Sequence, residues 1–317
     1  MRFLFLICTL FICTTVGAED IVVTTQGSPQ SRSAGYIIAK KLGFYKELGL
    51  NVKFNYTYSD ENVMAHLSSK QSQFITMPLI QGLSNRLNGY KVVNVMQTSH
   101  ASSMCVVSHI PFDNANGLRT KRIALWDSLD PYILKLFYPS RNISKYEIIY
   151  YDKGVNLFLS GAVDMMIARS YDELIQLRQC GFKLTPKNII YFKSRGYDIP
   201  EDGIYVTEDY IKSNKATIKK FVEASTKGWQ WVRAHPNDAV TIITREALAN
   251  KVSTNHFVQT QMLQEVMRLQ RYNPKSRDNY TLLFDEFERA KKIFKNNPTI
   301  QHLNYKDFMY NPSDITK

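Results

Sequence analysis

Residues 21–56 read IVVTTQGSPQSRSAGYIIAKKLGFYKELGLNVKFNY. The stretch opens with a β-branched run at 21–25 and then a Gln-Gly-Ser-Pro turn, a pattern typical of a strand that ends in a loop. Apolar side chains recur at nearly helical spacing over 34–46, and Gly49 stands where a helix C-terminal cap belongs. Residues 51–56 alternate between polar and apolar, which predicts a second strand. The chain therefore begins with a β-α-β unit.

The same alternation continues along the chain. We expect further strands at 73–77, 91–96, 121–126, 146–151, 164–168 and 203–207, and helices at 61–70, 79–88, 131–138, 155–160 and 171–180. From residue 202 onward the pattern is mostly helical, with helices predicted at 214–235, 237–249, 255–270 and 282–294. Strands that alternate with helices predict an α/β fold, with mainly parallel sheets flanked by helices.

The N-terminal residues resemble a secretory signal. Arg2 precedes an apolar run over 3–13, and the small residues Val16, Gly17 and Ala18 come before Glu19. We expect cleavage after Ala18 and export to the periplasm. The apolar run is about half the roughly 20 residues of a membrane-spanning helix. Acylation at Cys13 is a less favoured alternative, because no small residue lies just before that cysteine.

Removing 18 of the 317 residues would leave 299, a length at which a single core tends to divide into two domains. Two cysteines would remain, Cys105 and Cys180, either as a disulfide or as two free thiols. The net charge of +12 favours anionic partners. Because the basic residues are scattered rather than clustered, we do not expect nucleic-acid binding.

Enzyme signatures are absent from the sequence. It contains no Gly-rich phosphate loop, no Gly-x-Ser-x-Gly, no paired-histidine helix motif and no Cys-x-x-Cys. No two histidines after residue 18 lie at metal-ligand spacing. We therefore expect a protein without catalytic residues, metal or cofactor.

Polar and aromatic residues gather instead where predicted strands end. In open α/β sheets ligands bind outside the carboxyl ends of the strands, which here correspond to segments 30–36, 77–78, 97–103, 126–128 and 169–173. The ligand-binding candidates in these segments are Ser33, Gly35, Tyr36, Met77, Gln97, Ser102, Trp126, Tyr171 and Glu173.

Several candidates have a structural alternative. Tyr36 fits the core of its helix as well as a ligand site, and Ser33 could cap that helix. Trp126 ends an apolar strand, where packing alone could bury its indole. Asp127 or Ser128 could cap the helix that is predicted to start near Pro131.

Three segments carry a resemblance to a known family. They are AGYIIAKKLGFYKELGLNV at 34–52, GLRTKRIALW at 117–126, and FVEASTKGW at 221–229 with HPNDA at 235–239. They resemble the substrate-binding proteins of ABC importers, in the branch related to sulfonate-binding proteins and the thiamine-pyrimidine-synthase-like fold. The resemblance implies a type II periplasmic binding protein.

The resemblance implies two α/β lobes, each a mixed, mostly parallel sheet flanked by helices, which close on a ligand in the cleft between them. The crossings between the lobes would fall near 107–110 and 202–206. The first lobe would comprise 19–108 and 204–317, the second 109–203. Asp202, at the second crossing, is a further ligand-binding candidate. Aromatic rings would sandwich a planar ligand, and Glu173 would orient the polar edge of that ligand.

The implied ligand is a small heteroaromatic metabolite. Residues 171–174, Gly181 and 198–203 look closer to binders of thiamine pyrimidine or flavin precursors than to sulfonate or nitrate binders. Family members often have an aromatic residue where Gln26 or Ser33 stands, so the identity of the ring-stacking residues in this chain is left open. We expect a monomer that delivers this ligand to an ABC permease in the inner membrane.

Three alternatives stay open: a sulfonate- or nitrate-type anion binder, a receptor module for a membrane sensor kinase, and a thiamine pyrimidine synthase-like enzyme. The enzymes of this fold use a cysteine-rich motif. This chain contains no cysteine cluster, which disfavours the enzyme.

Overall fold

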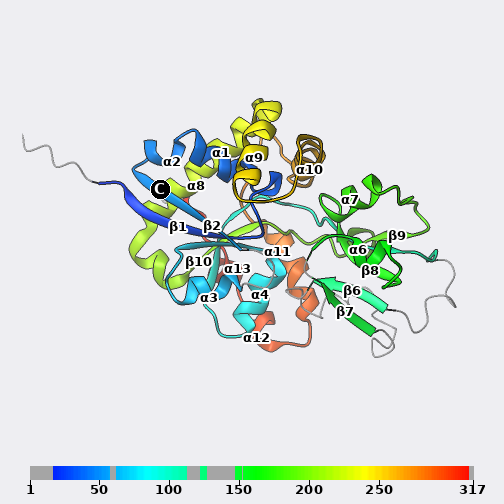
Figure 1. The fold of residues 1–317 in the computed structure, drawn as a ribbon. Helices are drawn as coiled ribbons and strands as arrows, with labels where there is room; N and C mark the ends of the chain where they lie inside the picture. The colour runs from blue at the N-terminus through cyan, green and yellow to red at the C-terminus, as the bar shows by residue number, and fades with distance from the viewer. Residues whose placement is uncertain (1–16, 58–61, 113–121, 127–146, 152, 314–317) are drawn as a thin grey trace, which may run out of the picture.

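The computed structural model describes residues 17–57, 62–112, 122–126, 147–151 and 153–313. Two five-stranded sheets lie side by side, each flanked by helices (Figure 1). This mixed α/β architecture of two lobes confirms the fold class predicted from the sequence.

The first sheet has the order β2-β1-β3-β10-β4. Its strands are β1 (Glu19–Gln26), β2 (Leu50–Thr57), β3 (Phe74–Met77), β4 (Val92–Gln97) and β10 (Gly203–Thr207). β1 pairs in parallel with β2 and β3, whereas β10 runs antiparallel between β3 and β4. Gly203 lies opposite both Met77 and Gln97, so β10 begins at the edge where β3 and β4 end.

The second sheet repeats this plan in the order β7-β6-β8-β5-β9. Its strands are β5 (Met104–Ser108), β6 (Arg122–Trp126), β7 (Glu147–Tyr151), β8 (Met165–Arg169) and β9 (Ile189–Tyr191). β6 pairs in parallel with β7 and β8, and β5 runs antiparallel to β8 and β9. Met104 lies opposite Arg169, so β5 also begins at the carboxyl edge of its sheet.

The chain passes from the first sheet to the second between Gln97 and Met104, and returns between Tyr191 and Gly203. The first crossing therefore precedes the 107–110 expected from the sequence, because residues 104–108 form the buried strand β5 of the second sheet. Strands β5 and β9 were not predicted. Because β5 and β10 directly follow the crossings, the carboxyl edges of both sheets face the same junction.

Helices cover both faces of the first sheet, with α1, α2, α8 and α9 on one side and α3, α4 and α12 on the other (Figure 1). The helices are α1 (Ala34–Lys41), α2 (Phe44–Glu47), α3 (Val63–Ser68), α4 (Leu79–Leu87), α6 (Asn156–Leu159), α7 (Glu173–Gln179), α8 (Glu208–Ala234), α9 (Pro236–Ala249), α10 (His256–Leu269), α11 (Phe284–Lys291), α12 (Pro298–Gln301) and α13 (Tyr305–Phe308). Short 3-10 turns occur at η1 (Ser31–Ser33), η3 (Phe192–Arg195) and η4 (Lys292–Phe294).

Most predicted helices are present, with different ends. The single helix expected over 34–46 is divided at Gly43, whose φ of 82° lies in the left-handed region. α8 has a kink at Asn214, whose φ of −131° is not helical, and the long helix predicted from 214 follows this kink. The short segment before the kink begins at Glu208, because Thr207 accepts the Tyr210 N–H and caps it there. The helix predicted at 131–138 lies outside the described residues.

Cys105 is buried and Cys180 exposed, and both are free thiols, so the two do not form a disulfide. Among the helices described, none has the length and apolar character needed to cross a membrane. The described residues also contain no cluster of three or more His, Cys, Asp or Glu that could hold a metal ion.

The first lobe depends on the close approach of α1 and α8. A Cβ at Gly228 would lie 2.0 Å from the carbonyl oxygen of Gly35, and a Cβ at Gly35 would lie 2.3 Å from the Trp229 ring. The indole of Trp229 is fully buried. Two glycines therefore allow the helices to pack backbone against backbone.

Gly228→Ala should lower the free energy of unfolding by about 3 kcal/mol, because the added methyl group overlaps the α1 backbone. The measurement is chemical denaturation. As a control, Ala216→Val enlarges an exposed residue of the same helix and should cost only about 0.5 kcal/mol of helix propensity. A Gly228→Ala protein as stable as the wild type would contradict this packing account, since Ala alone favours a helix by about 1 kcal/mol.

Candidate functional site

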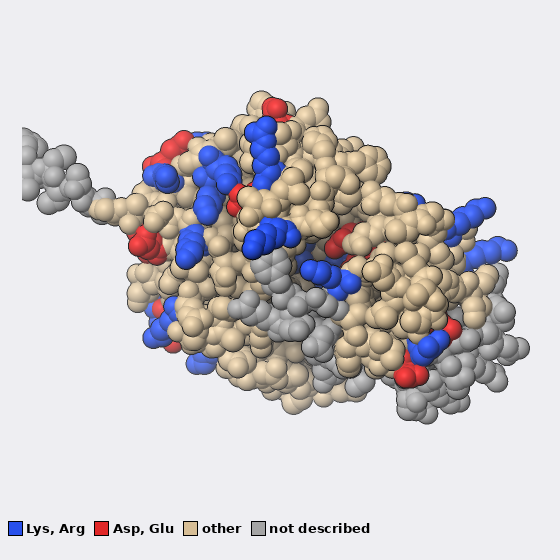
Figure 2. Space-filling view, viewed as in Figure 1, with Lys and Arg blue, Asp and Glu red and all other residues tan. Residues whose placement is uncertain are grey.

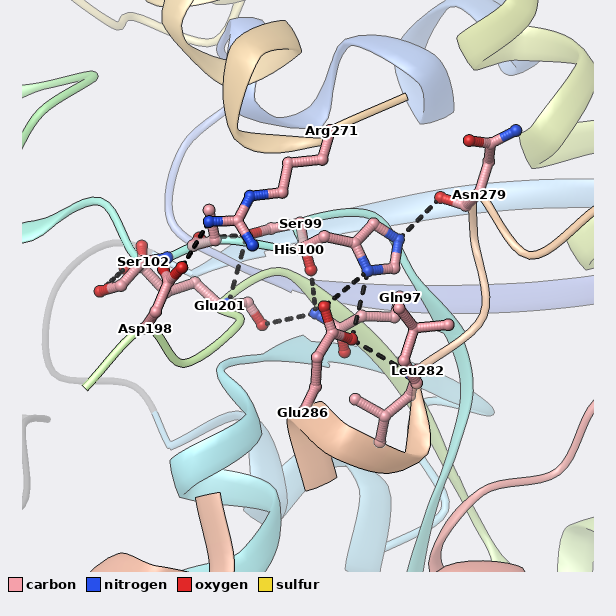
Figure 3. A network of polar contacts seen from close by, with 12 residues as sticks. Gln97, Ser99, His100, Ser102, Asp198, Glu201, Arg271, Asn279, Leu282 and Glu286 are labelled. Atoms are coloured by element: carbon pink, nitrogen blue, oxygen red, sulfur yellow. Dashed lines mark hydrogen bonds and ion pairs between the residues drawn. The ribbon is translucent and has the colours of Figure 1, made fainter. Parts of the chain in front are cut away.

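The two crossings are hydrogen-bonded to each other (Figure 3). Gln97 donates through Nε2 to the carbonyl oxygens of Ser99 (3.1 Å) and Glu201 (3.3 Å). The Thr98 N–H and hydroxyl both donate to the Asp202 carbonyl oxygen, at 2.9 and 2.8 Å. Gln97 is fully buried. Its observed contacts hold the crossings together.

Glu201 is a buried carboxylate at the centre of this junction. Oε1 accepts from the Ser103 N–H (2.7 Å) and the Ser102 hydroxyl (3.2 Å), and Oε2 accepts from the Ser103 hydroxyl (2.5 Å). Burial raises the pKa of Glu201, while the positive charge of Arg169 opposes the shift. Three hydrogen bonds to the carboxylate compensate part of its lost hydration.

His100 fixes the first crossing to the C-terminal part of the first lobe (Figure 3). Nδ1 lies 3.0 Å from Glu286 Oε1, and Nε2 lies 2.9 Å from the Asn279 carbonyl oxygen. Burial lowers the pKa of His100, but the bonds to Glu286 outweigh it and the pKa is raised overall. Because both ring nitrogens face acceptors, the imidazolium form satisfies this site best.

Arg32, in η1 of the first lobe, reaches the junction. Its Nε donates to Asp202 Oδ1 at 2.6 Å, and both side chains are mostly buried. A Cβ at Gly27, just beyond β1, would lie 3.6 Å from Arg32 Nη1, so the guanidinium lies over the carboxyl end of that strand. Figure 2 shows basic and acidic side chains together in the hollow between the lobes.

Trp126, Arg169 and Glu173 form one cluster in the second lobe. The Arg169 guanidinium carbon lies 3.9 Å from the centre of the Trp126 ring, a cation-π contact. Trp126 Nε1 donates to Glu173 Oε1 (3.0 Å), and the Arg169 N–H donates to Glu173 Oε2 (2.8 Å). Burial, with a contribution from Asp172, raises the pKa of Glu173 to about 7.

Tyr171 joins the lobes. It lies two residues beyond β8, yet its ring is buried and belongs, with Ile175 of α7, to the hydrophobic cluster that forms the first-lobe core. The neighbouring Ser170 N–H donates to the Ser103 carbonyl oxygen at 3.0 Å. Burial raises the pKa of the Tyr171 hydroxyl, while Arg32 and Arg169 act to lower it. The segment after β8 therefore contacts the first lobe directly in this conformation.

The structure brings six of the ten predicted ligand contacts to this junction: Gln97, Ser102, Trp126, Tyr171, Glu173 and Asp202. Their role as ligand contacts stays a prediction. The ligand-binding role of the other candidates also stays a prediction, and the contacts observed for them are structural.

Those other contacts lie mainly in the first-lobe core. Gly35 faces Trp229, and the Tyr36 ring packs edge-on against Trp229 with centroids 6.0 Å apart. Met77 is fully buried at the end of β3. Ser33 occupies the N-cap position of α1, but its side chain makes no capping hydrogen bond there.

Arg32 and Arg169 were not among the residues predicted from the sequence. Both lie in segments where ligand contacts were expected, 30–36 and 169–173. The chain has 40 Lys and Arg residues, and no local pattern separates these two arginines from the rest. Only the tertiary contacts with Asp202 and Trp126 distinguish them.

Comparison with known proteins agrees with this architecture. The family model described as NMT1/THI5 like matches residues 30–239, and the chain belongs to this family. The E. coli periplasmic aliphatic sulphonate binding protein SsuA superposes with a TM-score of 0.65 at 12% identity, over 93% of this chain and 92% of that one. The fold is thus that of a periplasmic binding protein.

Two curated relatives are more similar in sequence. YtlA of Bacillus subtilis (strain 168) is 24% identical over 64% of this chain, and the match spans 64% of YtlA, just under two thirds of its length. The riboflavin-binding protein RibY of Chloroflexus aurantiacus is 23% identical over 78% of this chain and 72% of RibY.

Stability should depend on pH through Glu173. Between pH 4.5 and about 7 the folded protein keeps this proton while the unfolded chain releases it. The protonated side chain of Glu173 therefore stabilises the folded state in full below pH 4.5. This part of the free energy of unfolding, up to about 3 kcal/mol, is lost as the pH rises towards 7. Because Glu173→Gln cannot titrate, the stability of wild type relative to this variant should fall from pH 5 to pH 8.

Urea denaturation at both pH values measures this difference. Glu223→Gln, on the exposed surface of α8, controls for the loss of a carboxylate and should retain the wild-type pH profile. A wild-type to Glu173→Gln difference that is the same at pH 5 and pH 8 would count against a neutral Glu173.

Proposed function

We propose that this protein is an extracytoplasmic solute-binding protein that delivers a small heteroaromatic metabolite to an ABC importer. Membership of the NMT1/THI5-like family and the two-lobed periplasmic-binding-protein fold support the class. The main support for this function is the junction, where the carboxyl edges of two sheets bring polar and aromatic side chains together. Ligands of open α/β sheets bind at such edges.

Three features support a heteroaromatic solute. Trp126 and Tyr171 provide rings at the junction. Gln26 ends β1 at the same edge, and its buried Oε1 has no hydrogen-bond partner among the described residues, so it can accept an N–H from a ring. The relative RibY is named as a riboflavin-binding protein.

Closure would report occupancy to the transporter. The crossings form the hinge, and the contact of Tyr171 with the first lobe stabilises the closed arrangement. A solute that contacts both lobes favours this arrangement by its differential affinity. Under this proposal the first 18 residues direct export, and a monomer docks on a permease in the inner membrane.

Thermal-shift screening and native mass spectrometry of the purified protein test the ligand class. A thiamine pyrimidine or a flavin at 100 times its dissociation constant should stabilise the fold by about 2.7 kcal/mol. Sulfonates and nitrate form the comparison set. Stabilisation by these anions alone, with no effect of any ring compound, would refute the heteroaromatic proposal.

Trp126→Ala should weaken binding of the ligand found in that screen by about tenfold or more, because it removes a ring and the platform under Arg169. Trp126→Phe keeps a ring face and should lose less. Tyr90→Ala removes an exposed aromatic ring, 42% accessible, and serves as the matched control. Calorimetric titration gives each affinity; equal affinity of wild type and Trp126→Ala would remove Trp126 from the site.

A further inference from the structure

The two partly buried arginines of the junction come from opposite lobes. Arg32 is bound to Asp202, and the adjacent Glu201 binds Ser103. The Ser103 carbonyl oxygen in turn accepts the N–H of Ser170, which directly follows Arg169. A continuous path of short contacts therefore places the Arg32 and Arg169 segments side by side across the cleft.

Both guanidiniums retain free donors. Within the described part of the chain, the Arg169 guanidinium forms no hydrogen bond or ion pair, and the Trp126 ring supports it from one side. Arg32 uses Nε for Asp202, while Nη1 and Nη2 have no partner among the described residues. Each guanidinium has five N–H donors, so several at this junction have no acceptor.

The nearby carboxylates are already engaged. Glu201 accepts three hydrogen bonds from Ser102 and Ser103, and Glu173 accepts from Trp126 and the Arg169 backbone. The charges of Arg32 and Arg169 repel each other across the closed junction. Burial and the charge of Arg32 act to lower the pKa of Arg169, but Tyr171 and Glu173 outweigh them, so that this pKa is raised overall. An oxyanion between them would relieve this repulsion.

We propose that the solute is anionic, and that Arg32 and Arg169 hold its acidic group between the lobes. This inference rests on the proposed solute-binding function. A guanidinium fork matches the oxygens of a phosphate, carboxylate or sulfonate. Arg32 binds from the first lobe and Arg169 from the second, so the acidic group links closure to occupancy. The ring of the solute then extends toward Gln26.

Calorimetric titration with pairs of compounds that share a ring tests this inference. The pairs are riboflavin with flavin mononucleotide, and hydroxymethylpyrimidine with its monophosphate. Wild type should bind the phosphorylated member of at least one pair about tenfold to a hundredfold more tightly than the neutral member. Inorganic phosphate, acetate and methanesulfonate are ring-free probes that distinguish the kinds of oxyanion.

Arg169→Gln breaks no ion pair among the described residues, so it should fold and should abolish most of the preference for the phosphorylated member. Arg32→Gln is combined with Asp202→Asn, so that no unpaired carboxylate is buried, and should act in the same direction. Arg245→Gln removes an exposed arginine of α9 and should leave the preference unchanged.

The outcomes separate the two proposals. Binding of ring-free anions alone, lost in Arg169→Gln, would refute the heteroaromatic proposal and support the anion site. Equal binding of neutral and phosphorylated members by wild type would overturn the anion site. So would a preference that survives in both arginine variants, or failure of every ring compound and anion to bind.

Discussion

The buried carboxylate of Glu201 is the constraint on which the two-lobed arrangement depends. A carboxylate removed from water is costly unless hydrogen bonds replace its hydration. Here Ser102 and Ser103 of the other crossing supply those bonds. The two crossings consequently keep one relative register, and that register sets where both sheets present their carboxyl edges.

The antiparallel strands β5 and β10 translate this register into the arrangement of side chains at the junction. Each begins directly after a crossing and pairs beside a strand that ends at the same edge. Trp126 and Arg169 therefore face the junction from the second lobe, and Arg32 faces it from the first. A solute at this position would touch both lobes, which is what a closing clamp requires.

Much of the lobe architecture could be predicted from the sequence. The β-branched runs and helical periodicity located β1, β2 and β4, and the long helices α9 and α10, to within a few residues. Local patterns are less informative for β5 and β9, because a short buried strand has no distinctive period. The first crossing lies earlier in the chain than predicted because the sequence pattern did not reveal β5.

The sequence by itself determined the α/β class and the strand-end segments in which ligand contacts were expected, because periodicity and turn residues are local properties. The two-lobed family was implied by the resemblance of three segments. Only the tertiary structure decided which side chains meet. It paired Arg32 with Asp202 across 170 residues and joined Glu201 to Ser103 across 98. Such charge pairing depends on the relative position of distant segments, which composition and spacing do not encode.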